Sequence, residues 1–337
     1  MTESTKPILS LKNVSIAFKD QNTSNTVVKD ISFELFTNEI LGIVGESGSG
    51  KSVTSLAILG LLPKTKSTTT GIIHFDNDDL LTLQERELRA LRGKAISMIF
   101  QEPMSSLNPS LTCGYQVVEI LKQHLKLSYK EAKTETLSLF DKVKLPRPEA
   151  IFSSYPHQIS GGQKQRVMIA MAIACKPKIL IADEPTTALD VTVQKDIIVL
   201  LKELQQETGM SIIFISHDLS LVSEIANRVI VMYKGEVVES AFAKAIFKNP
   251  QHTYTKALIS ARPSLKVRLK TLPTISDFLN QTPQSEVVSD TDREGKHKKM
   301  YEQPPLLVVK NVSKTYYSNG GLFASRKAVK AVKITLS

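Results

Sequence analysis

The sequence predicts an α/β fold built around a parallel β-sheet, and three patterns carry this prediction. Buried strands are indicated by short, continuous apolar runs at residues 40–44, 95–100, 179–182 and 212–215. Segments with apolar residues at helical spacing separate these runs, as the crossover connections of a parallel sheet require. A glycine-rich turn follows the first run and leads directly into one of the helical segments.

The composition is that of a soluble chain with enough apolar residues for a sizeable core. Of 337 residues, 42% are hydrophobic and 23% are charged. The longest apolar run, Leu56 to Leu62, is much shorter than the roughly 20 residues that span a bilayer. Residues 1–6 lack the basic and apolar regions of a signal peptide. We therefore expect neither a secreted nor a membrane-spanning chain.

The net charge of +10 is unevenly distributed along the chain. Residues 1–261 hold 29 basic and 27 acidic side chains, whereas residues 262–337 hold 14 and 6. A protein that binds nucleic acid is expected to carry its positive charge on the folded core. The nearly neutral first part therefore predicts that nucleic acid is not a partner, and the basic tail indicates a solvated or membrane-facing segment.

The elements along the chain follow from the periodicity of the apolar residues. Alternating residues predict two antiparallel strands, at 9–18 and 27–35, joined by a polar loop at 19–26. Helices are predicted at residues 51–62, 115–125, 129–143, 162–174 and 191–207, the last opened by Asp190 as its N-cap. Several helices fall between residues 101 and 163 without a strong strand, which predicts a helical insertion.

The end of the sequence contains a polar segment and then a partial repeat. Pro, Ser, Thr, Gln and charged residues dominate 263–304, which we interpret as a linker. Residues 306–313 then match residues 8–15, with Lys-Asn-Val-Ser identical, at a spacing of about 298 residues. We therefore expect a first domain at 1–262, a linker at 263–304, and at 305–337 the start of an incomplete second copy of the domain.

The glycine-rich turn has the spacing of a phosphate-binding loop, GxxxxGK[ST]. It consists of Gly45, Glu46, Ser47, Gly48, Ser49, Gly50, Lys51 and Ser52. In such a loop the backbone N–H groups and the helix N-terminus surround phosphate oxygens, and the lysine neutralises their charge. The Ser52 hydroxyl is then a candidate Mg²⁺ ligand.

Two carboxylates follow the apolar strand at 179–182, where ligands of open α/β sheets bind. Asp183 is a candidate Mg²⁺ ligand. Glu184 stands one residue further on and is a candidate general base for an attacking water.

Taken together, these motifs resemble those of the nucleotide-binding subunits of ABC transporters over residues 8–262. Phe18 resembles the aromatic residue that stacks on adenine, and Gln101 the Q-loop glutamine, a further Mg²⁺ ligand. The remaining matches are Ser160, Gly161, Gly162 and Gln163 with the ABC signature, Ala188, Leu189 and Asp190 with the D-loop, and His217 with the switch histidine. The resemblance implies a RecA-like P-loop NTPase core with an N-terminal antiparallel β subdomain and an inserted helical subdomain at about 102–163.

The resemblance also implies how ATP and Mg²⁺ are bound. Two subunits would pair head to tail, so that the phosphate loop of one and the signature of the other enclose each ATP. The signature precedes a helix, and its amides form a second anion site at that helix N-terminus. His217 would contact the γ-phosphate, with Glu184, His217 and Gln101 as the catalytic residues.

A finer resemblance, at residues 100–109, 190–194 and 252–258, is to the peptide and nickel importer branch. It implies an ATPase that energises uptake of peptides or a related small solute at the cytoplasmic face of the inner (plasma) membrane. Its partners would be membrane permease subunits, a second ABC ATPase in a homodimer or heterodimer, and indirectly an extracytoplasmic solute-binding protein. Many members of this branch carry a cysteine cluster for an iron–sulfur centre, but this sequence has no cysteine after Cys175.

Two other functions remain open on the sequence. A soluble ABC ATPase of repair or translation predicts hydrolysis stimulated by nucleic acid. A truncated or inactive half of a tandem ABC ATPase, serving only in binding or dimerisation, predicts a folded chain that binds ATP without turnover.

Overall fold

The computed structural model divides into two units by its internal contacts. It describes residues 6–20, 23–101, 106–187, 189–261, 268–271, 274–280, 286–309, 312–317 and 328–333. The first unit comprises residues 1–262 and 274–282, and the second comprises 263–273 and 283–337. Residues 274–282 thus differ from the expected linker, because helix α12 (Ile275–Leu279) packs on helix α11 (Thr253–Ser260).

The centre of the first unit is a six-stranded sheet in the order β10-β9-β3-β8-β7-β6. Its strands are β3 (Ile40–Val44), β6 (Ile96–Ile99), β7 (Ile179–Asp183), β8 (Ser211–Ser216), β9 (Arg228–Tyr233) and β10 (Glu236–Phe242). Strands β9, β3, β8, β7 and β6 are parallel, and β10 is antiparallel to β9. The predicted α/β class is confirmed, although strands β9 and β10 were not predicted from the sequence.

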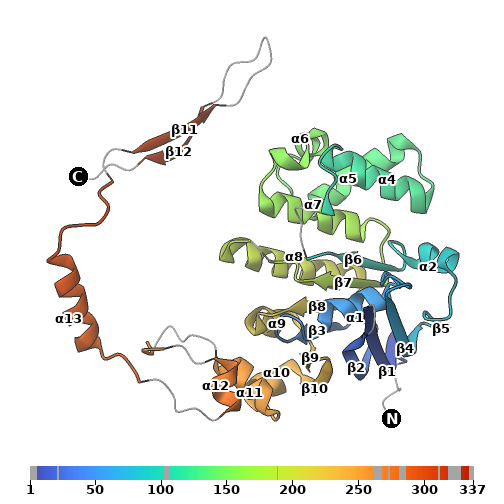
Figure 1. Cartoon of the computed structure of the whole chain (residues 1–337). Helices are drawn as coiled ribbons and strands as arrows, with labels where there is room; N and C mark the ends of the chain where they lie inside the picture. The colour runs from blue at the N-terminus through green and yellow to red at the C-terminus, as the bar shows by residue number, and fades with distance from the viewer. Residues whose placement is uncertain are drawn as a thin grey trace. The chain divides into compact units, whose positions relative to one another are not determined.

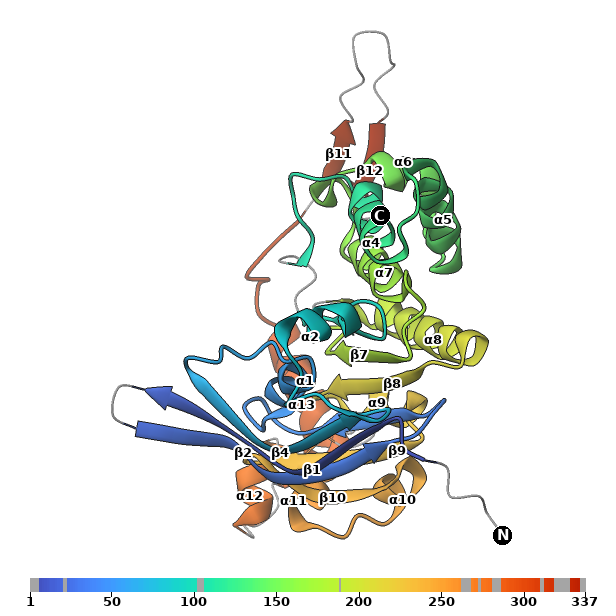
Figure 2. The same cartoon turned by 90° about the vertical axis from the view of Figure 1, so that its right-hand side faces the viewer.

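The parallel strands are buried on both faces, which explains their continuous apolar runs. On β8, Ile212 and Phe214 join one apolar cluster, whereas Ile213 and Ile215 join the other. The first cluster contains residues of helices α4, α5 and α7 to α9, and the second contains residues of α1 and of a second, antiparallel sheet. Figure 2 shows α1 beside the strands of this antiparallel sheet, and Figure 1 shows α4 to α7 grouped on the β6 side of the central sheet.

The antiparallel sheet has the strand order β2-β1-β4-β5. Its strands are β1 (Leu9–Asp20), β2 (Thr23–Leu35), β4 (Ser67–Phe75) and β5 (Asp78–Asp79). The predicted polar loop at 19–26 is wrong, because Lys19 pairs with Ser24 and Asp20 with Thr23. Backbone hydrogen bonds between strands do not require apolar side chains. The pairing of β1 with β2 therefore continues beyond the last apolar residues of the two strands.

Most helices of the first unit lie in the connections between strands, and the last three follow β10. In addition to α11 and α12 they are α1 (Lys51–Ile58), α2 (Glu85–Leu91), α4 (Cys113–Leu125), α5 (Tyr129–Lys142), α6 (Pro148–Ser153), α7 (Gly161–Ile173), α8 (Val191–Thr208), α9 (Leu219–Ile225) and α10 (Ala243–Lys248). Helix α1 ends before the predicted Leu62. Gly60 adopts a φ of 60°, and Leu61 N–H bonds to the carbonyl oxygen of Leu56 in a Schellman motif.

The second unit contains one helix and one hairpin among its described residues. Helix α13 (Asp290–Tyr301) lies within the segment interpreted as a linker, for which no helix was predicted. Ser289 caps this helix, Asp290 and Asp292 lie in its first turn, and two lysines lie in its last turn. The acidic residues face the positive end of the helix dipole and the lysines its negative end, so both groups stabilise the helix. Strands β11 (Ser313–Tyr317) and β12 (Ala328–Lys333) pair antiparallel.

No helix in the described ranges is both long and apolar enough to span a membrane.

Candidate functional site

The phosphate loop connects β3 to α1 and requires glycine at particular positions. A Cβ at Gly45 would lie 2.2 Å from the carbonyl oxygen of Met232 on β9. Gly50 has a φ of 103°, and a Cβ there would lie 3.0 Å from the side chain of Val28 on β2. The Ser49 N–H closes the turn by donating to the Glu46 carbonyl at 3.1 Å. The loop is thus packed between the two sheets and ends at the N-terminus of α1.

Lys51, the first residue of α1, is buried beneath this loop. Its Nζ donates to the carbonyl oxygens of Gly45 and Glu46, each at 2.8 Å. Burial lowers the pKa of Lys51, and the negative charges of Glu184 and Asp183 partly oppose that shift. The ammonium group therefore lies among backbone carbonyls and close to two carboxylates.

Asp183 is the last residue of β7, and it meets Ser52 on α1. Ser52 Oγ donates to Asp183 Oδ1 at 3.1 Å. Burial raises the pKa of Asp183, and the charge of neighbouring Glu184 adds to the rise, although the Ser52 hydrogen bond opposes it. A buried carboxylate beside a hydroxyl is an all-oxygen donor pair of the kind that Mg²⁺ prefers, so these residues fit that ion.

Glu184 accepts three hydrogen bonds on one oxygen. Its Oε2 lies 3.1 Å from Gln101 Nε2, 3.1 Å from His217 Nδ1 and 2.9 Å from Thr187 Oγ1. Glu184 also has a φ of 46°, unusual for a residue other than glycine, and backbone strain of this kind is concentrated at functional sites. The structure thus brings together the three predicted catalytic residues, which come from three different strand ends.

These contacts decide the pKa of Glu184. Burial alone would raise it, but hydrogen bonds from His217 and Thr187, with the charges of His217 and Lys51, outweigh burial and lower it. The carboxylate is therefore held ionised. Thr187 was not predicted from the sequence as a site residue. Its hydroxyl three residues after Glu184, within reach of that carboxylate in a tight turn, was the signal that could have identified it.

The signature residues form a capping box at the start of α7. Ser160 N–H donates to Gln163 Oε1 at 2.9 Å, and Gln163 N–H donates to Ser160 Oγ at 3.3 Å. Gly162 packs closely on α8, since a Cβ there would lie 2.9 Å from Val193. Asp190 caps α8 by accepting from Val193 N–H at 3.0 Å, so its predicted N-cap role is confirmed. Ser160 and Gly161 are exposed at the surface.

Phe18 lies on β1 opposite Asn25 of β2 and Ser67 of β4. It is half-buried against the apolar cluster of the antiparallel sheet. The other D-loop residue named from the sequence, Ala188, lies outside the described residues, whereas Leu189 packs against the main apolar cluster.

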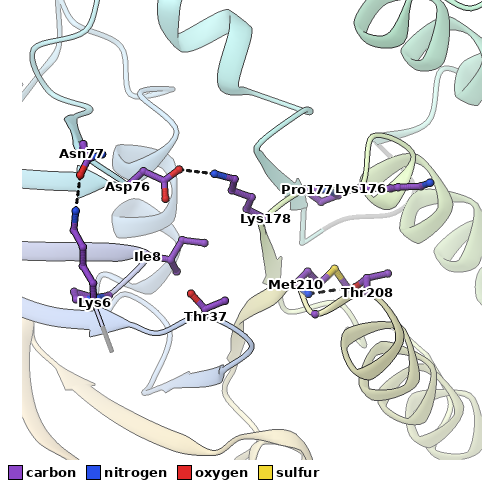
Figure 3. A pocket seen from close by; sticks show the side chains of 12 residues that line it. Lys6, Ile8, Thr37, Asp76, Asn77, Lys176, Pro177, Lys178, Thr208 and Met210 are labelled. Carbon is purple, nitrogen blue, oxygen red and sulfur yellow. Dashed lines mark hydrogen bonds and ion pairs between the residues drawn. The ribbon is translucent and has the colours of Figure 1, made fainter. Parts of the chain in front are cut away.

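A cavity of about 600 Å³ lies away from this site, at the starting ends of β7 and β8 (Figure 3). None of the predicted site residues lines it. Two of its lysines are paired within its rim: Lys178 Nζ lies 2.7 Å from Asp76 Oδ2, and Lys6 donates to Asn77. The predicted catalytic residues lie instead at the opposite ends of the strands.

A buried lysine beneath a glycine-rich loop, beside a strand-end Asp-Glu pair, defines a P-loop protein that hydrolyses nucleotides. The chain belongs to the ABC transporter family, whose model matches residues 28–187, and it is an ATPase of that family. A second model, for the C-terminal region of oligopeptide/dipeptide transporters, matches residues 238–285. The predicted family and its importer branch are thereby confirmed.

Named relatives and solved structures agree with this assignment. The chain is 52% identical to the dipeptide transport ATP-binding protein DppD of Haemophilus influenzae, over 79% of this chain and 81% of that protein. It is also 52% identical to the peptidoglycan transport ATP-binding protein YejF of Agrobacterium fabrum, over 77% of this chain but only 48% of that protein. The dimeric, post-hydrolysis structure of the ATP-binding cassette MJ0796 with ADP and phosphate is 32% identical, with a TM-score of 0.63 over 70% of this chain and 98% of that chain.

Proposed function

We propose that this chain hydrolyses ATP to energise the import of peptides or a related small solute across a membrane. The observation that carries the proposal is the convergence of Gln101, Thr187 and His217 on the carboxylate of Glu184, beside the buried Lys51. The solute class rests on the relatives, which are named as dipeptide and peptide transport ATP-binding proteins.

In this proposal the phosphate loop binds the ATP phosphates. Lys51 and the amides of Gly48 to Ser52 face the phosphate oxygens, and Phe18 stacks on adenine. Ser52, Asp183 and Gln101 hold Mg²⁺, which neutralises charge on the β- and γ-phosphates when bound.

Glu184 is the proposed general base, because it is ionised and held by fixed donors. No hydrogen bond from the described residues reaches its second oxygen, Oε1, which can therefore orient an attacking water and accept its proton. His217 and Gln101 each contact Glu184. A movement of either side chain when the γ-phosphate binds or leaves would therefore change the hydrogen bonds of the base.

The exposed signature supports a head-to-tail dimer as the active unit. The capping box uses the backbone N–H groups of Ser160 and Gln163, and within the described residues those of Gly161 and Gly162 remain for an anion. We propose that ATP is enclosed between this group and the phosphate loop of a second ABC ATPase, in a homodimer or heterodimer. Membrane permease subunits would dock on the helical group α4 to α6 at the cytoplasmic face of the inner membrane and connect it to an extracytoplasmic solute-binding protein.

We also propose that residues 305–337 begin a second ABC domain. The β11–β12 hairpin repeats the antiparallel pairing of β1 with β2, and the sequence that leads into it repeats residues 8–15. The chain spans about half of the Agrobacterium relative, a length that leaves room in that protein for a second domain.

Substitution of the base tests the proposal. Glu184→Gln is expected to retain ATP binding and to lose a factor of about 10²–10⁴ in turnover, because the amide cannot accept the proton. Phosphate release and binding of a fluorescent ATP analogue measure the two properties, with the exposed Glu236→Gln as the matched control. Wild-type turnover by Glu184→Gln, or a folded wild-type chain that binds ATP without hydrolysing it, would refute the assignment.

A further inference from the structure

Tyr254 connects the C-terminal region of the first unit to the phosphate loop. It lies on α11, within residues 238–285 that match the model for the transporter C-terminal region. Its side chain is fully buried, and its hydroxyl oxygen accepts a hydrogen bond from the backbone N–H of Glu46 at 3.0 Å. A residue far along the chain thus holds the second residue of the loop.

The turn after β9 makes a second contact with the same loop. Tyr233, the last residue of β9, stacks on Tyr254 with ring centroids 4.1 Å apart. Two residues later, Gly235 N–H donates to the carbonyl oxygen of Ser49 at 3.2 Å. The loop is therefore held near its start by Tyr254 and near its end by Gly235.

Helix α11 is itself anchored. The carboxylate of Glu239 on β10 accepts the backbone N–H groups of Gln251 and His252, each at 2.9 Å. His252 Nδ1 then accepts the N–H of Tyr254 at 3.2 Å. These bonds fix the start of the helix on the central sheet, so the position of the Tyr254 hydroxyl is determined by β10 rather than by the loop.

The hydroxyl is suited to a fixed, neutral contact. Burial raises the pKa of Tyr254 to about 12, so it stays protonated in the physiological range. Without it, the part-buried Glu46 N–H would lose its partner, and the loop would rearrange to find another acceptor. Such rearranged loops would not present their amides to phosphate, and the fraction of molecules competent to bind ATP would fall.

We propose that Tyr254 is a positioning residue through which the C-terminal region of this unit sets the affinity of the phosphate loop for ATP. The inference rests on the proposed role of the loop in binding ATP. It adds a function to the C-terminal region, which supplies no residue to the loop itself but holds it in the receptive conformation.

The test is Tyr254→Phe in the full chain, which removes one hydroxyl and keeps the buried ring. The dissociation constant for ATP is expected to rise about three- to tenfold, as the loss of one hydrogen bond predicts, with kcat changed less than twofold. Tyr129→Phe, on the exposed surface of α5, is the matched control and should bind as wild type does. A purely structural role would lower the thermal midpoint without changing affinity.

Lys51→Ala separates this inference from the proposed function. If Lys51→Ala abolishes ATP binding while Tyr254→Phe binds ATP with wild-type affinity, only the inference is overturned. If Lys51→Ala binds ATP normally, the proposed role of the loop fails as well. Affinities are measured well below the thermal midpoint of each variant, so a small loss of stability leaves the comparison valid.

Discussion

Gly45→Ala is expected to displace the phosphate loop by about 1 Å. The new Cβ would lie 2.2 Å from the carbonyl oxygen of Met232, whereas an ordinary contact of this type is about 3.3 Å. Met232 is fully buried on β9, which is hydrogen-bonded on both sides, so the loop must move instead of the strand. A misplacement of about 1 Å in a catalytic site costs about 10²-fold in rate, or about 2.7 kcal/mol in transition-state binding.

The assay is steady-state phosphate release over a range of ATP concentrations, with thermal unfolding to verify the fold. We expect kcat/KM to fall about 10²-fold. Gly209→Ala is the matched control: Gly209 also has a positive φ, of 70°, but a Cβ there meets nothing within 4 Å. It should lose some stability and keep its activity. If Gly45→Ala hydrolyses ATP within about threefold of the wild-type rate, the close approach to Met232 does not position the loop.

Two further predictions concern titrating groups. Thr187→Val removes a hydrogen-bond donor that lowers the pKa of Glu184. The pKa of Glu184 should therefore rise, and the acid limb of the pH profile of kcat/KM should move to higher pH. Thr187→Ser keeps the hydroxyl and should keep the wild-type profile. Coincident profiles for Val and wild type would contradict this role. Burial raises the pKa of Cys113 to about 11 and also raises that of Cys175, so a thiol reagent at about pH 8 should label neither in the native chain and both after unfolding. Rapid labelling of the native chain would show that the segments around Cys113, at the start of α4, and Cys175, in the turn after α7, open readily.

Much of the fold was predictable because its signals are local. Apolar runs marked β3, β6, β7 and β8, since strands buried on both faces must be apolar throughout. The loop at residues 45–52 and the carboxylates at 183 and 184 were predictable for the same reason: each motif is a short segment with a fixed relation to one strand end. Asp190 was recognised as a cap because an N-cap bond spans only a few residues.

The tertiary structure decided what depends on distant segments. Sequence alone did not show that Gln101, Thr187 and His217 share one oxygen of Glu184, because the register of three strands determines that meeting. It did not show that Tyr254 reaches Glu46 across 208 positions, or that α12 packs back on α11 beyond the expected boundary at 262. Periodicity reports only which side of an element faces apolar neighbours, whereas the packed fold decides which neighbours those are.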